Sequence, residues 1–353
     1  MRNYDTRMKT VLTFVGRFRF YLACIIGIVV SVALAGTFFA IRTRSSEDLL
    51  VISYDSTRDY FDEIGSLLRA HGTCLVDSRH GGSLDQSRAV IRGLRADAVL
   101  LATPLEIENL AAKGLIVPDW KTQFPYGSSP FSAPIVFLVR AHNPKNIVDW
   151  TDLERPDVKV STTHPDVSGA GRLAFLALYH SAARSGTPKI PEAFCRRVYS
   201  RADCLSMGAH AAANFFATTS QGDVLLTWEN EARRATGMYG TNKLTVVFPP
   251  STILGEPVAA LINNHAQERH SGRCAMQLFD LMFSVDGQRS AARNYLRPRA
   301  AQVQQEFASQ FPPVAFFTVE EAFGGWSNVM KIHFSPGGTV ERVIPKKRLD
   351  SLP

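Results

Sequence analysis

The segment that decides the fold runs Leu49-Leu50-Val51-Ile52-Ser53-Tyr54-Asp55-Ser56. Its first six residues are almost continuously apolar, which predicts a buried β-strand. Asp55 and Ser56 are suited to cap a following helix. The apolar positions of that helix recur at the i, i+3, i+4 spacing of one helical face: Tyr60, Phe61, Ile64, Leu67 and Leu68. A buried strand that leads directly into an amphipathic helix is the repeating unit of α/β proteins.

The same unit recurs along the chain, as a strand pattern next to a helix start rich in small residues. The strand patterns are Ala98–Ala102, Val158–Thr163 and Val224–Trp228. The helix starts are His80-Gly81-Gly82-Ser83, Ser168-Gly169-Ala170-Gly171 and Met207-Gly208-Ala209. Strands separated by helices indicate parallel sheets covered by helices on both faces, so we expect an α/β fold. The tail beyond His333 is interpreted as a solvated end.

The length and charge of the chain exclude several classes of protein. A chain of 353 residues suits about two domains, and 45% hydrophobic with 20% charged residues exclude a disordered or collagen-like chain. The net charge is +7. Residues 1–45 contain seven basic side chains and one acidic one, a net charge of +6, so the remaining body is nearly neutral. We therefore expect no nucleic-acid partner.

The N-terminus contains an apolar run, residues 20–41, of 22 uncharged residues. At 1.5 Å per residue this run is long enough for a hydrocarbon core of about 30 Å. Five basic residues precede it and two follow, which predicts that the body lies outside the cytoplasmic membrane, in the periplasm. Residues 1–45 are then either a signal peptide, cleaved after Ala33-Leu34-Ala35, or an uncleaved inner-membrane anchor.

The cysteines suit an oxidising compartment but show no metal-ligand spacing. Cys195 and Cys204 are close enough in sequence to close a small loop, and a disulfide between them is one open interpretation. The stretch Gly169–Ala174 matches a loose dinucleotide fingerprint, but a loop separates it from its strand. We expect no metal, no cofactor and no enzymatic activity.

The helix starts carry the informative chemistry. A helix N-terminus offers unpaired N–H groups and about half a positive charge, which suits an anion. Small residues let an anion approach the backbone, and the hydroxyls of Ser83 and Ser168 add donors. Ordinary helix capping explains any one of these loops. The set of them indicates convergence on a single anion at the carboxyl ends of the strands.

At this point six stretches resemble one known family, the sulfate/thiosulfate-binding proteins of bacterial ABC importers. They occur in family order and span about residues 49 to 338: Ser53-Tyr54-Asp55-Ser56-Thr57-Arg58; His80-Gly81-Gly82-Ser83; Ile135-Val136-Phe137-Leu138-Val139-Arg140 with Asn143-Pro144-Lys145; Asp223-Val224-Leu225-Leu226-Thr227-Trp228-Glu229-Asn230-Glu231-Ala232; Tyr295-Leu296-Arg297-Pro298-Arg299; and Phe323-Gly324-Gly325-Trp326. The resemblance implies a two-lobed periplasmic binding protein of type II that encloses its ligand between the lobes. It implies an ABC permease as partner, and we expect a monomer. We assign residues 46–131 with 256–353 to lobe 1 and residues 132–255 to lobe 2.

The resemblance also implies the ligand-binding residues. In that family uncharged donors hold the dianion. The matching positions are Asp55 through its backbone N–H, Ser83, the helix start Ser168, Gly169 and Ala170, then Ala209, and Trp228 through its indole. An indole N–H can donate a hydrogen bond but cannot accept one, which suits a fully ionised oxyanion.

The chain departs from the family pattern next to several of these positions. The departures are Leu84, Asp85, Val167 and the stretch His210-Ala211-Ala212-Ala213. Backbone donation survives them, whereas the support around it changes. The expected ligand is sulfate or thiosulfate. The alternatives are another tetrahedral oxyanion such as molybdate, or a membrane-tethered oxyanion sensor or interaction protein on the same fold.

Overall fold

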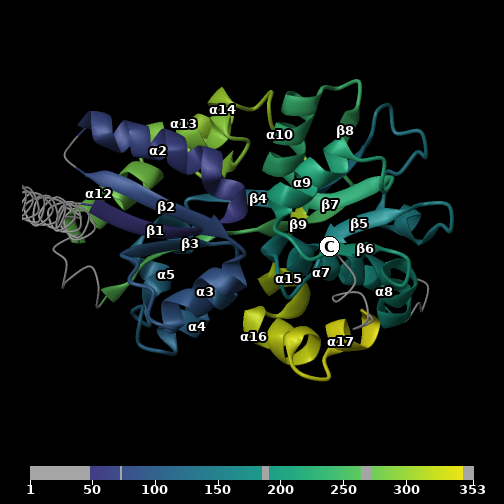
Figure 1. The fold of residues 1–353 in the computed structure, drawn as a ribbon, viewed down its shortest axis with the longest axis horizontal. Helices are drawn as coiled ribbons and strands as arrows, with labels where there is room; N and C mark the ends of the chain where they lie inside the picture. Colours follow the sequence, from purple (N-terminus) through teal and green to yellow (C-terminus); the bar gives the residue numbers. More distant parts are fainter. Residues whose placement is uncertain (1–47, 72–73, 185–190, 264–271, 345–353) are drawn as a thin grey trace, which may run out of the picture. The chain divides into compact units, whose positions relative to one another are not determined.

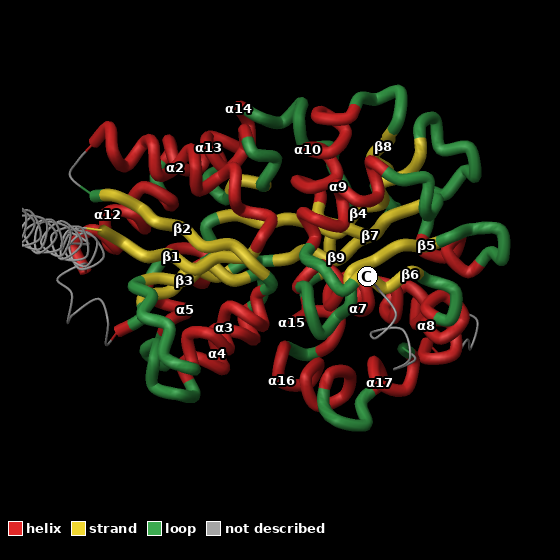
Figure 2. Tube along the Cα trace, viewed as in Figure 1, coloured by secondary structure: helices red, strands yellow, loops and turns green. Residues whose placement is uncertain are grey.

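The computed structural model describes residues 48–71, 74–184, 191–263 and 272–344. The apolar run at 20–41 and the basic stretch near residue 346 lie outside these ranges. None of the helices in the described ranges combines the length and the apolarity needed to cross a membrane. The described ranges form two sheets, each flanked by helices (Figures 1 and 2).

The first sheet has four strands in the order β10-β3-β1-β2. The strands are β1 (Asp48–Tyr54), β2 (Leu75–Gly81), β3 (Ala98–Leu101) and β10 (Val258–Leu261). β1 is parallel to both of its neighbours, with Ser53 opposite His80 and Val51 opposite Ala98, and β10 is antiparallel to β3. The predicted strand at residues 49–54 is therefore confirmed as the centre of a sheet.

Helices cover both faces of this sheet, and together they form the first lobe. They are α2 (Arg58–His71), α3 (Ser83–Ile91), α4 (Pro104–Ala111), α5 (Trp120–Gln123), α6 (Pro125–Ser128), α12 (Gly272–Phe283) and α13 (Val285–Arg293). Alternate side chains of β1 point to opposite faces of the sheet, and helices cover both faces, which is why the whole strand is apolar. Leu49 and Val51 pack with residues of α2 and α12, whereas Leu50 and Ile52 pack with residues of α3 and α4 (Figure 1).

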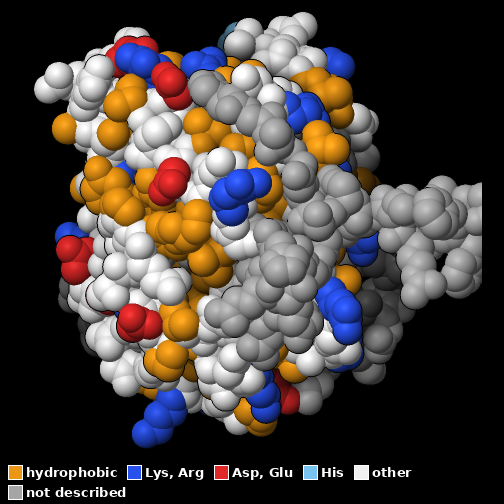
Figure 3. All heavy atoms as spheres, turned by 90° about the vertical axis from the view of Figure 1, so that its left-hand side faces the viewer, with side chains coloured by type: hydrophobic (Ala, Val, Ile, Leu, Met, Phe, Trp, Pro, Cys, Tyr) orange, Lys and Arg blue, Asp and Glu red, His pale blue; other side chains and the backbone are white. Residues whose placement is uncertain are grey.

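On the face of this lobe shown in Figure 3, basic, acidic and hydrophobic side chains are interspersed. The described side chains on that face thus carry both charge signs, which agrees with the nearly neutral body expected from the sequence.

The second sheet follows the order β12-β9-β4-β7-β5-β6, and β8 and β11 also pair with β4. Its strands are β4 (Phe131–Arg140), β5 (Val160–Thr163), β6 (Asp203–Leu205), β7 (Val224–Trp228), β8 (Leu244–Val247), β9 (Ser251–Gly255), β11 (Arg297–Pro298) and β12 (Ala315–Phe317). β5 is parallel to β6 and β7, whereas β4 is antiparallel to β7, β8, β9 and β11. Both sheets are therefore mixed. The chain crosses from one sheet to the other before β4 and again before β10, and each of these strands is antiparallel to its neighbours.

Apart from the two-residue strand β11, which packs on α13 of the first lobe, this sheet and its helices form the second lobe. The main helices are α7 (Gly169–Arg184), α8 (Pro191–Tyr199), α9 (Ala209–Thr218) and α10 (Glu229–Tyr239). Figure 1 shows α9 and α10 on one side of the sheet and α7 and α8 on the other. The two faces bury separate sets of residues: Phe137 packs in the cluster that contains Leu173, and Val136 packs in the cluster that contains Phe216.

The C-terminal part of the described chain packs on the second lobe. After the short helix α14 (Ala301–Glu306), which packs on α13 of the first lobe, its elements are α15 (Val319–Phe323), α16 (Trp326–Val329), a π-helix η3 (Met330–Phe334) and α17 (Thr339–Val343). The 3-10 helix η2 (Trp150–Glu154) precedes β5. β12 pairs in parallel with β9, and Arg342 forms a 2.9 Å ion pair with Glu192 of α8. Val340 and Val343 are buried, so the interpretation of everything beyond His333 as a solvated end was wrong. We propose the sequence-based division into lobes with one amendment, the transfer of β12 to α17 to the second lobe.

The disulfide between Cys195 and Cys204, which the sequence left open, does not form, because Cys195 is a free and buried thiol. The disulfide joins Cys74, at the start of β2, to Cys274 in α12 instead. These cysteines are 200 residues apart in sequence. Only the packing of α12 on the first sheet brings them together, so no spacing rule could have predicted the pair.

Candidate functional site

Five strands of the two sheets end in helix starts that face the other lobe. In the first lobe β1 leads into the 3-10 helix η1 (Asp55–Thr57), and β2 leads into α3. In the second lobe β5, β6 and β7 lead into α7, α9 and α10. The carboxyl ends of parallel strands meet at one edge of a sheet, where ligands of α/β proteins bind. We call these five helix starts the lobe junction.

Three glycines of the lobe junction lie where the opposite lobe approaches the backbone. A methyl group added to Gly82 would lie 2.5 Å from the carbonyl oxygen of Val167, and one added to Gly169 would lie 2.5 Å from the Cβ of Ala102. A methyl group on Gly208 would lie 2.0 Å from Oδ2 of Asp55. Gly82 and Gly169 thus have no room for a side chain because the two lobes are in contact, whereas a side chain at Gly208 would displace the Asp55 carboxylate. The sequence alone could not supply this reason.

Ser83 is the first residue of α3 and is buried. Its Oγ accepts a hydrogen bond of 3.0 Å from the backbone N–H of Ala102. A hydroxyl has one proton and two lone pairs. Because the bond to Ala102 uses a lone pair, the proton of Ser83 stays free to donate to a bound anion.

The segment from Ser168 to Ala170 forms the start of α7. The backbone N–H of Ser168 donates to the carbonyl oxygen of His164 at 3.0 Å, and the carbonyl oxygen of Ser168 accepts from the N–H of Arg172. Ser168 can therefore serve as a donor only through its hydroxyl. The N–H groups of Gly169 and Ala170 are in the first turn of α7, where no intrahelical acceptor exists.

Asp55 and Ala209 lie on opposite sides of the lobe junction. Oδ2 of Asp55 accepts a hydrogen bond of 2.9 Å from the backbone N–H of His210, so this carboxylate already occupies part of the start of α9. The N–H of Ala209, one residue earlier, has no acceptor within the helix. Burial and the neighbouring Glu231 raise the pKa of Asp55 to about 6.

Trp228 is the last residue of β7, and only 1% of its surface is exposed. Its ring lies 6.0 Å, centre to centre, from that of Tyr54 in the first lobe. A methyl group on Gly255 would lie 2.4 Å from Cζ3 of the indole, and one on Gly169 would lie 3.7 Å from Cζ2. The indole therefore sits at the lobe junction, next to the start of α7.

The seven residues expected to bind the ligand thus all belong to the lobe junction. The structure adds polar links between the lobes that the sequence did not predict. Arg172 of α7 forms a buried ion pair with Glu106 of α4, and Asn230 donates to the carbonyl oxygen of Ser56 at 2.8 Å. The sequence around Glu106, Thr103-Pro104-Leu105-Glu106, has the form of a helix start and carries no signal of an ion pair to a distant residue.

The carboxylates next to Trp228 are both neutralised by basic side chains. Glu229 contacts Nε of Arg233 at 2.9 Å and Nε of Arg297 at 2.5 Å. Glu231 contacts Nε of Arg234 at 3.0 Å and Nδ1 of His210 at 3.3 Å. Among the described residues, no group of three or more His, Cys, Asp or Glu side chains could hold a metal ion.

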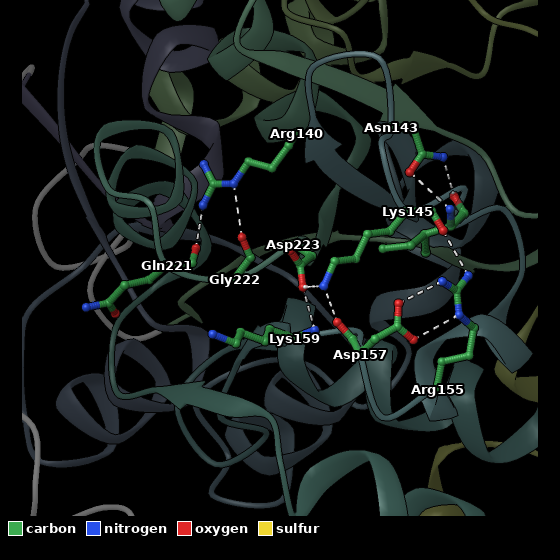
Figure 4. A network of polar contacts seen from close by, with 10 residues as sticks. Arg140, Asn143, Lys145, Arg155, Asp157, Lys159, Gln221, Gly222 and Asp223 are labelled. Atoms are coloured by element: carbon green, nitrogen blue, oxygen red, sulfur yellow. Dashed lines mark hydrogen bonds and ion pairs between the residues drawn. The ribbon is translucent and has the colours of Figure 1, made fainter.

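One of the stretches that resemble the family lies away from the lobe junction. Asn143 and Lys145 follow β4 and belong to a polar network that also includes Asp157 and Asp223 (Figure 4). This network surrounds the amino ends of β5 and β7, the opposite end of the sheet. We call it the distal network.

The fold and the lobe junction define a class of protein: a two-lobed binding protein with helix starts and uncharged donors at the boundary of its lobes. The model of the bacterial extracellular solute-binding proteins matches residues 49–297. The sulfate-binding protein of Escherichia coli is 36% identical over 84% of this chain and 92% of its own length. The thiosulfate-binding protein of Pseudomonas aeruginosa is 34% identical over 89% of this chain and 97% of its own.

A solved structure gives the same result. The sulfate-binding protein SubI of Mycobacterium tuberculosis superposes with a TM-score of 0.74, at 29% identity over 80% of this chain and 98% of its own. The chain therefore belongs to the bacterial extracellular solute-binding proteins, in the family of the sulfate- and thiosulfate-binding proteins. The expected α/β fold of a type II binding protein is confirmed.

Proposed function

We propose that this protein captures sulfate, or thiosulfate, outside the cytoplasmic membrane and delivers it to an ABC-type importer. The observation that carries the proposal is the convergence of helix starts from both lobes, with Ser83, Gly169 and Trp228 at their boundary. A relative that is 36% identical over 303 aligned residues is a sulfate-binding protein.

The proposed ligand set is Asp55 through its N–H, Ser83 and Ser168 through their hydroxyls, Gly169, Ala170 and Ala209 through their N–H groups, and Trp228 through its indole. All of these donors are uncharged. A dianion held in this way is stabilised by local dipoles and direct hydrogen bonds at several helix starts. The nearly neutral body is consistent with this mode of binding, because no cationic surface is required.

The donor set also predicts which anions are rejected. Hydrogen phosphate carries a proton that needs an acceptor, whereas sulfate needs donors only. The carboxylate of Asp55 is an acceptor at the lobe junction, and its Oδ2 already accepts from the N–H of His210. We therefore propose that sulfate and thiosulfate bind and that hydrogen phosphate does not.

Calorimetric titration of residues 46–353 with sulfate, thiosulfate, molybdate and phosphate tests this proposal. We expect saturable binding of sulfate or thiosulfate with one site per chain. Molybdate as the tightest ligand would change the assigned oxyanion, and binding of none of these ions, or a preference for phosphate, would refute the proposed function.

The proposal includes a location and partners. We propose that the body is exported to the periplasm by the segment at 1–45, acts as a monomer, and docks with both lobes on an ABC permease. N-terminal sequencing of the exported protein separates the two fates of that segment. A start at Gly36 supports a signal peptide, whereas an intact N-terminus supports an anchor.

A further inference from the structure

The carboxylate of Asp55 belongs to the first lobe but reaches the helix start of the second. Its Oδ2 accepts from the N–H of His210 at 2.9 Å, next to the N–H of Ala209. Gly208 makes this approach possible, because any side chain there would collide with the carboxylate. The carboxylate can hold this position only while the lobes are in contact. The surroundings that set its pKa therefore depend on lobe closure.

Two further titratable groups complete this contact. Nδ1 of His210 lies 3.3 Å from Oε1 of Glu231, and Oε2 of Glu231 lies 3.0 Å from Nε of Arg234. Glu231 has 1% of its side chain exposed. We call Asp55, His210 and Glu231 the interlobe cluster. Its carboxylates come from both lobes, and Arg234 also donates to Asn214, so Glu231 is not its only partner.

Water can reach this cluster through a cavity of about 60 Å³, lined by residues that include Ser56, Arg58, Asp59, His210 and Asn230. That volume has room for water. The buried Oγ of Ser56 and Oδ1 of Asn230 have no partner among the described residues, which fits bound water there. Water can therefore reach His210 and Glu231 of the cluster while the lobes are closed.

We propose that the interlobe cluster makes anion binding depend on protons, so that proton uptake by Asp55 strengthens binding of the dianion. This inference rests on the proposed function. The proton removes the negative charge of the Asp55 carboxylate beside the N–H groups of Asp55 and Ala209, which are proposed donors. Loss of that repulsion favours the bound dianion.

The other charged groups near Asp55 do not reverse this direction. Burial and Glu231 raise the pKa of Asp55 to about 6, inside the range in which the effect is expected. Burial, followed by Arg58 and His210, lowers the pKa of His80 to about 4, so His80 stays neutral throughout.

Calorimetric titration of the full chain with sulfate between about pH 8 and about pH 5.5 tests the inference, since sulfate stays fully ionised there. We expect the affinity to increase by about tenfold as the pH falls, the equivalent of one unit of pKa. Near pH 6, titrations in two buffers of different ionisation enthalpy should show net proton uptake on binding.

Two variants locate the effect. Asp55→Asn keeps the backbone N–H and an acceptor for the N–H of His210, and His210→Arg places a fixed positive charge beside the carboxylates of the cluster, which favours their ionised form. We expect each of them to lose at least half of the pH dependence. Asp85→Asn is the matched control, because Asp85 is also in a first turn at the lobe junction but its side chain is 70% exposed. It should retain the wild-type pH dependence.

A wild-type affinity constant within about twofold over this range would overturn the inference, because a one-unit linkage predicts about tenfold. A pH dependence that survives both variants would overturn it as well. Absence of sulfate binding at every pH would contradict the proposed function instead, so the two failures are distinguishable. If Asp55→Asn does not fold, His210→Arg alone decides.

Discussion

The two ends of the second sheet differ in whether their backbone polar groups have hydrogen-bond partners within the protein. At the distal network, charged side chains occupy backbone carbonyls: Arg140 donates to Gly222 at 3.0 Å, and Arg155 donates to Lys145 at 2.8 Å (Figure 4). Asp223 accepts from Lys145 and from the N–H of Lys159. At the lobe junction, in contrast, N–H groups at helix starts have no intrahelical acceptor. At the distal network, hydrogen bonds within the protein occupy the backbone groups and hold the loops in place. At the lobe junction, the helix-start N–H groups remain able to bind an anion.

The first way to test this difference is Gly169→Ala, for which we expect the largest effect. The added methyl group would lie 2.5 Å from the Cβ of Ala102 in the other lobe, so the lobes cannot close fully. We expect sulfate affinity to fall by about a hundredfold, or about 3 kcal/mol, while folding is preserved. The measurement is calorimetry together with thermal unfolding.

Gly237→Ala in α10 is the matched control, because its methyl group meets no atom within 4 Å. It should leave affinity unchanged. Equal affinity for Gly169→Ala and wild type would show that ligand binding does not require the contact between the lobes.

Trp228→Phe removes the indole N–H and keeps an aromatic ring at the lobe junction. A hydrogen bond to a charged group contributes about 1.5–3 kcal/mol. We expect sulfate affinity to fall by about thirtyfold, with a small change in unfolding temperature. Trp150→Phe is the control, because the Nε1 of Trp150 donates to Ser251 at 2.9 Å. It should cost stability and leave affinity intact; the reverse pattern would remove Trp228 from the site.

Asp223→Asn tests the distal network. The change weakens the bond to Lys145 and the bond to the N–H of Lys159, which are 2.9 and 2.8 Å long. Because these groups are partly exposed, we expect the free energy of unfolding to fall by about 1 kcal/mol only. Denaturant unfolding measures this loss, and sulfate affinity should stay unchanged. A change in affinity comparable to that of Trp228→Phe would mean that the two ends of the sheet are coupled.

The smallest expected effect concerns two aspartates, one at the lobe junction and one in the distal network. The hydrogen bond from Arg155 lowers the pKa of Asp157 in the distal network, whereas burial raises the pKa of Asp55 to about 6. Because the folded state binds the proton of Asp55 more tightly, its stabilising contribution is present below about pH 4 and is lost as the pH rises through 6. Asp157 acts in the opposite direction, and its contribution is lost as the pH falls.

We therefore expect Asp55→Asn to be about 1 kcal/mol more stable than wild type near pH 7 and about equally stable near pH 4. Denaturant unfolding at both pH values measures the difference. A stability difference that does not change with pH would show that Asp55 titrates normally.

The fold was largely predictable, because its signals are local. The strand at residues 49–54 and the one at Val224–Trp228 were predicted nearly to the residue, and the helix starts at Ser83 and Ala209 were found from small residues before an apolar helical face. The antiparallel course of β4 and β10 was not predicted, because strand direction depends on which neighbours a strand meets.

The disulfide and the buried ion pair of Arg172 with Glu106 were missed for the same reason. Each joins residues from distant parts of the chain, and no spacing in the sequence records such a contact. The carboxyl group of Asp55 is similar: its sequence context indicated a helix cap and a backbone donor, but its position on α9 exists only because the lobes meet.

The sequence by itself determined the α/β units, the small residues at the helix starts and the family. It also showed that the net positive charge lies in residues 1–45 and that the body is nearly neutral. Only the tertiary structure decided why Gly82 and Gly169 leave no room for a side chain, since the atoms that exclude one belong to the opposite lobe. The physical reason is the range of the interactions: capping and helical periodicity act within a few residues, whereas close packing acts between any segments that the fold brings together.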